Sequence, residues 1–169
     1  LDSERLTYLF RRNGLELDMV VRELWSELSK SEFEPIAFEL NFGEDGQMPA
    51  VPISGSRMQA QLRGFVDRVD AWCDGYQSFL RVVDYKTGKK DFDYCDVFNG
   101  VGLQMLLYLF ALEQGGEALV EGKRISAGVQ YFPARFPYLS EDGRLDPDTA
   151  QKEHLKQAKR RGLILKDEA

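Results

Sequence analysis

The sequence is poor in the residues that bind zinc or build disulfide frameworks. Its 169 residues include two cysteines, Cys73 and Cys95, and one histidine, His154. No Cys-x-x-Cys pair is present, and His154 lies far along the chain from both cysteines. We therefore expect neither a zinc site nor a disulfide framework, but two reduced thiols in a cytoplasmic protein.

Long apolar runs and targeting signals are also missing. No run approaches the roughly 20 apolar residues that a membrane-spanning helix needs. No basic start followed by a short apolar segment marks a secretory signal. The chain starts at Leu1 rather than at a methionine, so we expect a single domain that is part of a longer protein.

An excess of basic residues is absent as well. The formal net charge is −6, from 22 basic and 28 acidic residues. This balance argues against a protein that coats nucleic acid by charge alone. It leaves room for a site built from carboxylates with local positive charge. Lys86, Lys89 and Lys90 form one such basic cluster, and Arg63 and Arg68 lie near it in the sequence.

The pattern of apolar residues predicts a mixed α/β domain. Helical spacing indicates an amphipathic helix over about 15–30, and 35–42 has the composition of a strand. Three glycines and two prolines in 43–55 favour a loop or an irregular edge strand. One long or broken strand is predicted over 57–72 and another over 78–86, and the turn residues between them indicate a β-hairpin.

Further elements follow the hairpin. Residues 97–113 predict a helix too apolar to lie at the surface, and 125–132 predict a buried strand. Asp146-Pro147-Asp148 is a favourable helix start, and that helix is expected to end near Arg161. The alternation of helices and strands predicts a central sheet with helices around it.

Two aspartates are expected to face each other across the hairpin. Side chains alternate along a strand, so Asp84 and Lys86 share a face. If Gly75-Tyr76 is a two-residue turn, paired residue numbers sum to 151 and Asp67 lies directly across from Asp84, with Cβ atoms about 5 Å apart. Carboxylates that close repel each other unless a cation or a shared proton lies between them. An all-oxygen site of this kind suits Mg²⁺ or Mn²⁺.

Lys86 adds a positive charge beside these carboxylates. A carboxylate-bound metal lowers the pKa of its water, and an ammonium group orients that water or stabilises negative charge on phosphorus. Together these groups predict phosphodiester hydrolysis. Asp-x-Lys alone is equally the pattern of a surface ion pair, which contributes little to stability. The opposed Asp67, the apolar strands and the glycine after Lys86-Thr87 favour a site.

The apolar helix carries two polar side chains, Gln104 and Tyr108, four residues apart on one face. A buried amide needs hydrogen-bond partners. Either backbone groups satisfy Gln104, or both side chains face a cleft, where they contact substrate or position Lys86.

Three stretches in this order resemble the RecB-family branch of the PD-(D/E)xK nucleases: GFVDRVD (64–70), VVDYKTG (82–88) and LQMLLYLFAL (103–112). The resemblance is to the C-terminal nuclease domain of the AddB/RexB-type subunit of bacterial ATP-dependent helicase–nucleases. It implies a restriction-endonuclease-like α/β core, with a central mixed β-sheet flanked by helices. It also implies that 1–169 is a single nuclease domain cut from a larger helicase–nuclease subunit.

The resemblance further implies a Mg²⁺- or Mn²⁺-dependent deoxyribonuclease, acting as an exonuclease of a recombinational repair complex on DNA with an AddA-like partner subunit. Asp67 and Asp84 would bind the metal together with the backbone carbonyl of Tyr85, and Lys86 would be the catalytic lysine.

The resemblance extends to a helix and to one more strand. Gln104 and Tyr108 match the family's Gln-x-x-x-Tyr helix. Glu39 resembles its acidic residue on the preceding strand less closely, and is equally well explained as a glutamate on the surface of a strand. RecB-type nucleases carry a histidine on the first helix, and none precedes His154 here. AddB-type domains hold a [4Fe–4S] cluster through one upstream cysteine and a downstream cysteine-rich run, which this chain's cysteines do not fit. We therefore expect the cluster only in the full-length parent.

Other functions are less well supported. Lys86-Thr87-Gly88 also occurs in serine β-lactamases, but the Ser-x-x-Lys nucleophile that they need is missing. No GxxxxGK[ST] phosphate loop is present, so no ATP hydrolysis is predicted. The remaining alternative is a nuclease-like module that binds DNA or docks a partner subunit without activity of its own.

Overall fold

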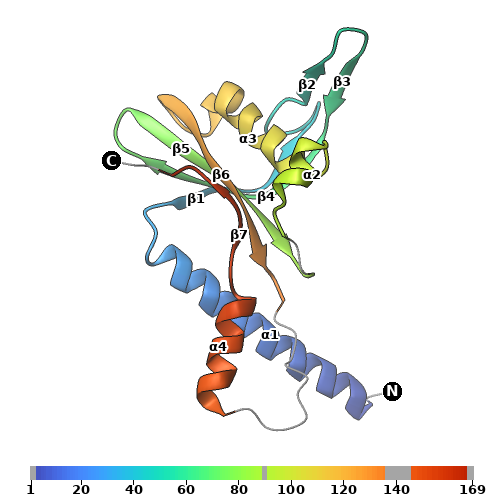
Figure 1. The fold of residues 1–169 in the computed structure, drawn as a ribbon, viewed down its shortest axis with the longest axis vertical. Coiled ribbons are helices and arrows are strands. Elements are labelled where there is room, and N and C mark those ends of the chain that lie inside the picture. The colour runs from blue at the N-terminus through green and yellow to red at the C-terminus, as the bar shows by residue number, and fades with distance from the viewer. Residues whose placement is uncertain (1–2, 89–90, 136–145, 167–169) are drawn as a thin grey trace.

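A five-stranded mixed β-sheet forms the centre of the chain (Figure 1). The computed structural model describes residues 3–88, 91–135 and 146–166. The strands lie in the order β1-β4-β5-β6-β7, and β5 and β6 are the parallel pair. The sheet strands are β1 (Glu34–Phe42), β4 (Gly64–Cys73), β5 (Gln77–Lys86), β6 (Lys123–Pro133) and β7 (Arg161–Ile164). This architecture confirms the predicted α/β class with a mixed central sheet.

The apolar core lies between one face of the sheet and helix α3 (Gln104–Gly115). Val69 of β4 and Val82 of β5 are almost fully buried, and they belong to one cluster with Leu112 of α3. Burying a side chain of this size contributes about 2 kcal/mol. The prediction of a helix too apolar for the surface is confirmed for α3, whose position over the sheet is set by this contact.

The opposite face of the sheet meets α1 (Glu4–Leu28) through charged side chains. Asp70 is fully buried and forms ion pairs with Arg68 at 2.7 Å and with Arg81 at 2.6 Å. Glu27 of α1 lies 3.3 Å from Arg68 and 3.2 Å from Arg81, and 3.0 Å from Arg160. Arg68 is thus held under α1, on the face of the sheet opposite to Asp67.

The predicted hairpin is present with the predicted register. The strand expected over 57–72 is broken at Arg63 into β3 (Gln59–Leu62) and β4. Paired residues of β4 and β5, from Arg68–Val83 to Cys73–Ser78, all sum to 151. Asp74 accepts hydrogen bonds from the backbone N–H groups of Tyr76 and Gln77, which closes the turn.

Two helices differ from the sequence prediction. Helix α1 begins at Glu4, where Ser3 accepts a hydrogen bond from Leu6, and not near residue 15. The helix expected over 97–113 is divided into α2 (Tyr94–Phe98) and α3. Gly100 and Gly102 between them adopt φ of +83° and +72°, a conformation outside a right-handed helix that glycine adopts at little cost.

The C-terminal segment also differs from the prediction. Helix α4 (Pro147–Gln157) ends before Arg161, which instead begins the unpredicted strand β7. Within 43–55, β2 (Val51–Ser54) pairs with β3 as a separate two-stranded sheet that projects from the domain (Figure 1). Lys89 and Lys90 of the expected basic cluster lie outside the described residues. No helix in the described part of the chain is long and apolar enough to cross a membrane.

Candidate active site

The two predicted metal-binding aspartates line one small cavity. It measures about 30 Å³ and lies between the β4–β5 strand pair and the start of α3. A cavity needs a volume of at least ~10–15 Å³ to hold a water molecule. The volume of this cavity is therefore sufficient for a single small ion or for one or two waters. We call it the carboxylate cavity; its lining residues are Phe65, Val66, Asp67, Val82, Val83, Asp84, Gln104, Met105 and Tyr108.

Asp67 also replaces a backbone contact at the end of the hairpin. The β4–β5 pairing ends at Arg68–Val83, and beyond it the Tyr85 N–H donates a 2.7 Å hydrogen bond to Oδ2 of Asp67. The N–H and C=O of one strand residue face the same neighbouring strand. The carbonyl of Tyr85 therefore also faces the β4 side, where Asp67 lies.

Asp84 and Lys86 are in direct contact at the end of β5. Nζ of Lys86 lies 2.5 Å from Oδ2 of Asp84. The Asp84 side chain is 25% exposed and that of Lys86 is 40% exposed, so the pair is partly accessible to solvent. The structure thus brings Asp67, Asp84 and Lys86 to one end of the hairpin, as the alternation and register predicted.

Gln104 and Tyr108 line the same cavity from α3. The side-chain amide of Gln104 donates to the Tyr108 hydroxyl at 3.2 Å, and that hydroxyl donates to the carbonyl of Arg63 at 3.1 Å. Tyr108 is 1% exposed and its hydroxyl is bound to a backbone carbonyl, so its contacts are structural. Gln104 is exposed, so of the two side chains only its amide is accessible to a ligand. Gly64 permits this arrangement, because an added Cβ there would lie 2.2 Å from the Tyr108 oxygen.

Tyr131, which was not predicted as a site residue, lies beside Asp84 in the parallel β5–β6 pair. Nζ of Lys86 lies 6.0 Å from its ring centre. Burial raises the pKa of the Tyr131 hydroxyl, the nearby Asp84 carboxylate raises it further, and Lys86 opposes both. Tyr131 was not identifiable from the sequence, because its neighbours come from a strand more than forty residues earlier and joined by a parallel crossover.

Glu39 is not joined to the two aspartates. It lies between the pairs Phe38–Arg68 and Leu40–Val66, at the level of Asp67 on β4. Its side chain is exposed, its φ is +48°, and it does not line the carboxylate cavity. The geometry therefore gives no support to a role of Glu39 in holding a metal.

The donors around the cavity suit a hard divalent cation. Two carboxylates and one backbone carbonyl are oxygen ligands, and Mg²⁺ is commonly held by one or two carboxylates with water completing its shell. Groups of three or more His, Cys, Asp or Glu side chains that could hold a metal are absent from residues 3–88, 91–135 and 146–166. The set fits Mg²⁺ or Mn²⁺, which accept water ligands, better than zinc with its closed tetrahedral sites.

The cysteines do not form part of any such site. Cys73 and Cys95 are both exposed and free, and Sγ of Cys73 contacts the hydroxyl of Ser78 at 3.2 Å. A [4Fe–4S] cluster needs four cysteine ligands. The residues of this chain therefore do not supply a cluster site.

Comparison with known proteins agrees with the geometry. Residues 3–165 match the family model of the PD-(D/E)XK nuclease superfamily. The chain belongs to this superfamily. The superfamily model spans the carboxylate cavity and all five strands of the central sheet.

Curated relatives are each named as one subunit of an ATP-dependent helicase/deoxyribonuclease. One from Acetivibrio thermocellus is 39% identical over 88% of this chain, and one from Symbiobacterium thermophilum is 37% identical over 100% of it. A third, from Desulforamulus reducens, is 32% identical over 99% of the chain. The chain spans only 13% to 15% of the length of these relatives.

Proposed function

We propose that this chain hydrolyses phosphodiester bonds in DNA with the help of a divalent cation, Mg²⁺ or Mn²⁺. The observation that carries the proposal is the meeting of Asp67, Asp84 and Lys86 at one end of the hairpin, two of them lining a cavity sized for one ion. Membership of a nuclease superfamily and the names of the relatives support the same chemistry.

Asp67, Asp84 and the backbone carbonyl of Tyr85 would hold the cation. When bound, it would stabilise negative charge on the phosphate oxygens and make an attacking water more acidic. The hydrogen bond from the Tyr85 N–H orients Asp67 toward this position. Gln104 lines the same cavity with an exposed amide, which is a donor for a phosphate oxygen.

Lys86 would act on the substrate and not on the metal. Its ammonium group would stabilise the charge that builds up on the scissile phosphate or orient the attacking water. Removing a single such donor from an active site lowers the rate by about 10²- to 10³-fold. Asp84, 2.5 Å away, keeps the lysine at the cavity.

We further propose that the activity is exonucleolytic and belongs to a helicase–deoxyribonuclease assembly that contains an AddA-like subunit. The relatives' name and the small share of their length covered by this chain support a domain of a larger machine. An exonuclease requires a strand end, so it degrades linear single-stranded DNA and leaves circular single-stranded DNA intact.

The test uses end-labelled linear and circular DNA with Mg²⁺ or Mn²⁺, and EDTA as the metal-free control. Lys86→Ala should lower cleavage by about 10²- to 10³-fold, and Asp84→Asn should abolish it. Asp74→Asn is the matched control, because it also replaces a carboxylate by an amide, but at the far end of the same hairpin. The side-chain oxygen that closes the turn is kept.

The same assay decides between the nuclease and a module that only binds DNA or docks a partner. DNA binding without cleavage, by this chain and by the full-length protein alike, would overturn the catalytic proposal. Cleavage that survives both EDTA and Lys86→Ala would overturn the assigned roles.

A further inference from the structure

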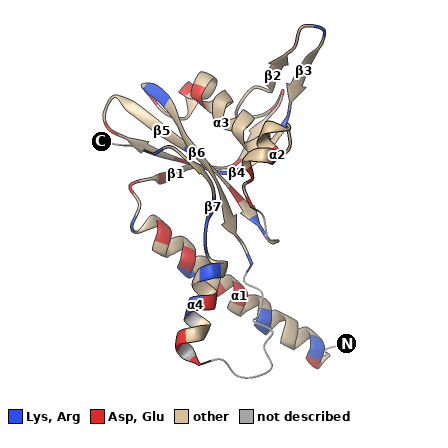
Figure 2. Cartoon of the chain, viewed as in Figure 1, with Lys and Arg blue, Asp and Glu red and all other residues tan. Residues whose placement is uncertain are grey.

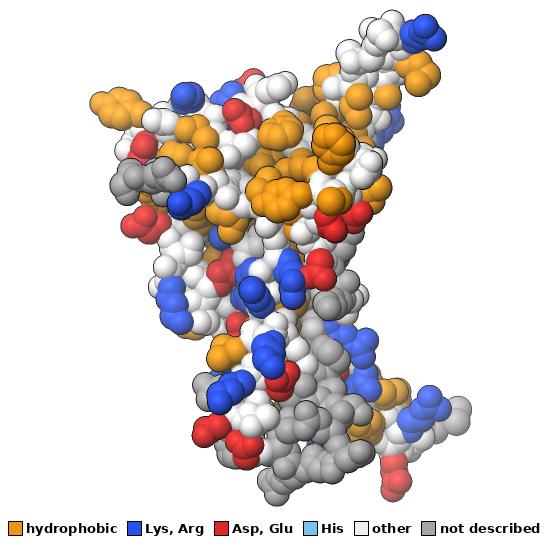
Figure 3. Space-filling view, viewed as in Figure 1, with side chains coloured by type: hydrophobic (Ala, Val, Ile, Leu, Met, Phe, Trp, Pro, Cys, Tyr) orange, Lys and Arg blue, Asp and Glu red, His pale blue; other side chains and the backbone are white. Residues whose placement is uncertain are grey.

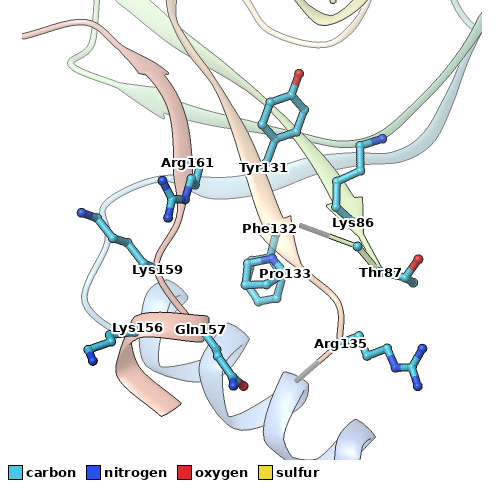
Figure 4. Close-up of a pocket in the computed structure, with 11 residues that line it drawn as sticks. Lys86, Thr87, Tyr131, Phe132, Pro133, Arg135, Lys156, Gln157, Lys159 and Arg161 are labelled. Atoms are coloured by element: carbon cyan, nitrogen blue, oxygen red, sulfur yellow. The ribbon is translucent and has the colours of Figure 1, made fainter. Parts of the chain in front are cut away.

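A second and larger hollow lies next to Lys86. It measures about 590 Å³ and is formed by the ends of β5 and β6, the end of α4 and the start of β7 (Figure 4). We call it the basic recess; its lining residues are Lys86, Thr87, Gly88, Tyr131, Phe132, Pro133, Arg135, Lys156, Gln157, Lys159 and Arg161. Nothing in the proposed hydrolysis step requires it.

The charge of this lining is of one sign. Among the described residues, eleven line the recess, of which five are lysine or arginine and none is acidic, although acidic residues outnumber basic ones by 28 to 22 in the chain. Figure 3 shows several basic side chains, with acidic ones among them, at the narrow middle of the molecule where the sheet meets α4, and Figure 2 marks basic positions in blue on α4 and β7. A concentration of positive charge on an acidic protein indicates a surface that binds an anion.

The cations of the recess remain available to a ligand. Arg161 pairs with Asp91 at 2.7 Å, but the two side chains are 43% and 50% exposed. An exposed pair of this kind contributes little to stability. Arg135 pairs with Glu16 at 3.5 Å, and its side chain is 47% exposed while that of Glu16 is 13% exposed. Lys159 is exposed, and no acidic side chain of the described residues forms an ion pair with it.

The end of α4 opposes anion binding, but only weakly. The C-terminus of a helix carries about half a negative charge. Lys156 in this last turn pairs with Glu153, yet its side chain is 71% exposed. Four of the five cations of the recess also have a carboxylate partner, and Lys159 has none among the described residues. The recess thus presents several cationic side chains close together, which suit a ligand with several negative charges such as a chain of phosphates.

The size of the recess selects a single strand over a duplex. A volume of 590 Å³ equals that of a cube about 8 Å wide, which is narrower than the roughly 12 Å of one major groove of duplex DNA. A single strand with its flexible backbone can enter such a space, and proteins bind it by a positive groove that follows the phosphates.

The recess meets the candidate active site at Lys86 and Tyr131. Both residues line the recess, Lys86 contacts Asp84 at 2.5 Å, and Tyr131 is paired with Asp84 across β5 and β6. A ligand in the recess therefore lies next to the Asp84 side of the carboxylate cavity.

We propose that the basic recess binds the phosphate backbone of a DNA single strand next to the bond that is cut. The position of the bound strand next to the cut bond rests on the proposed function. The binding of the strand to the recess does not. Lys156, Lys159 and Arg161 contact phosphates outside the scissile one, and the metal ligands take no part in these contacts.

The test measures binding of a fluorescent oligothymidylate to the 169-residue chain in EDTA, so that cleavage plays no part. The double variant Lys156→Ser/Lys159→Ser should bind about 10- to 100-fold more weakly. The salt dependence should also fall, because each lost single-strand phosphate contact reduces the slope of log K against log salt by about 0.7, or about 1.4 for two. Lys123→Ser/Lys152→Ser is the matched control, since both lysines are exposed and neither lines the recess.

The outcomes separate the two proposals. Equal binding and equal salt slopes for the two double variants would overturn the recess, as would no binding by the unaltered chain. Binding of a blunt duplex as tight as that of a single strand would overturn the choice of strand. Weaker binding by the Lys156→Ser/Lys159→Ser variant, together with no nuclease activity in any protein, would support strand binding in the recess and reject the nuclease proposal.

A methylphosphonate oligothymidylate, whose backbone is neutral, tests whether the phosphate charge is recognised. It should bind the unaltered chain and the recess variant equally weakly.

Discussion

The Asp67 carboxylate accepts a 2.7 Å hydrogen bond from the backbone N–H of Tyr85, one residue beyond the position that faces it in the register. A side chain thus takes the place of a strand at the point where β4 and β5 stop pairing. Asp67 has two functions in consequence. It closes the end of the hairpin, and it presents its carboxylate to the cavity that Asp84 also lines.

These two functions of Asp67 are separable by substitution. In Asp67→Asn the amide oxygen still accepts from Tyr85, so the free energy of unfolding should change by less than about 0.5 kcal/mol. In Asp67→Ala the Tyr85 N–H loses its partner, which should cost about 1–2 kcal/mol. Calorimetric titration should show that both variants lose Mn²⁺ binding. Equal destabilisation in urea unfolding would show that the hydrogen bond is not the stabilising contact.

Gly64 and Tyr108 are coupled by close contact. In Gly64→Ala the added Cβ would lie 2.2 Å from the hydroxyl oxygen of Tyr108 and 3.4 Å from the ring carbon that carries this oxygen. The ring is 1% exposed and stacked on Phe42 at 4.6 Å, so it has little room to move. Overpacking of this kind costs about 1–3 kcal/mol.

The measurement is a double-mutant cycle. Adding Tyr108→Phe removes the clashing oxygen and should restore part of the stability that Gly64→Ala loses, although Tyr108→Phe alone destabilises by removing the hydrogen bond to Arg63. Strictly additive effects in thermal unfolding would contradict this coupling.

The sequence predicts the hairpin well because its determinants are local. Alternating apolar residues and the turn around Gly75 are sufficient to set a register, and the register places Asp67 and Asp84 together. The division between α2 and α3 was missed because apolar residues continue across it. Apolar periodicity does not distinguish one helix from two, and the signal lies in the backbone freedom of Gly100 and Gly102.

Features formed by distant segments were not predictable. The residues of the basic recess come from three separate parts of the chain, and β7 is too short to show a pattern. Strand alternation predicts the face on which Arg68 lies, but not its partners. The alternation that sets Asp67 toward the cavity sends Arg68 to the opposite face, where its partners lie on α1 and β5.

Asp146 gives a pH-dependent contribution to the start of α4. Hydrogen bonds from Thr149 lower the pKa of its carboxyl below 3.8, and the backbone N–H of Asp148 adds to them. A lowered pKa stabilises the folded state above the unfolded-state value of 3.8 and loses this effect as the pH falls through the folded-state value. Asp146→Asn keeps the cap without the charge.

We therefore expect hydrogen exchange at the start of α4 to be slower in the unaltered chain than in Asp146→Asn at about pH 7, after correction for intrinsic rates. The two should become equal as the pH falls below 3.8. A difference that stays constant over this range would show that the carboxylate charge is not responsible.

The buried ion pairs under α1 should be the most sensitive point of the fold. Asp70 and Arg68 are fully buried, and the Arg81 side chain is 10% exposed. Asp70→Asn removes the nearer carboxylate of two buried guanidinium groups and leaves them only the longer pairs with Glu27. Breaking a buried pair costs about 3–5 kcal/mol. Urea unfolding should show this loss. Asp18→Asn is the matched control. It breaks an exposed pair with Arg22, whose distance of 2.7 Å equals that between Asp70 and Arg68, and it should leave the free energy of unfolding unchanged.

Glu27→Gln should act on the helix more than on the sheet. Glu27 joins α1 to Arg68, Arg81 and Arg160, and α1 has no buried residue of its own in the described structure. Asp70 still neutralises the first two arginines in this variant, so the sheet should remain folded. Hydrogen exchange should therefore accelerate in α1 and stay slow in β4 and β5. Unchanged exchange in α1 would show that apolar contacts and not this charge network hold the helix to the sheet.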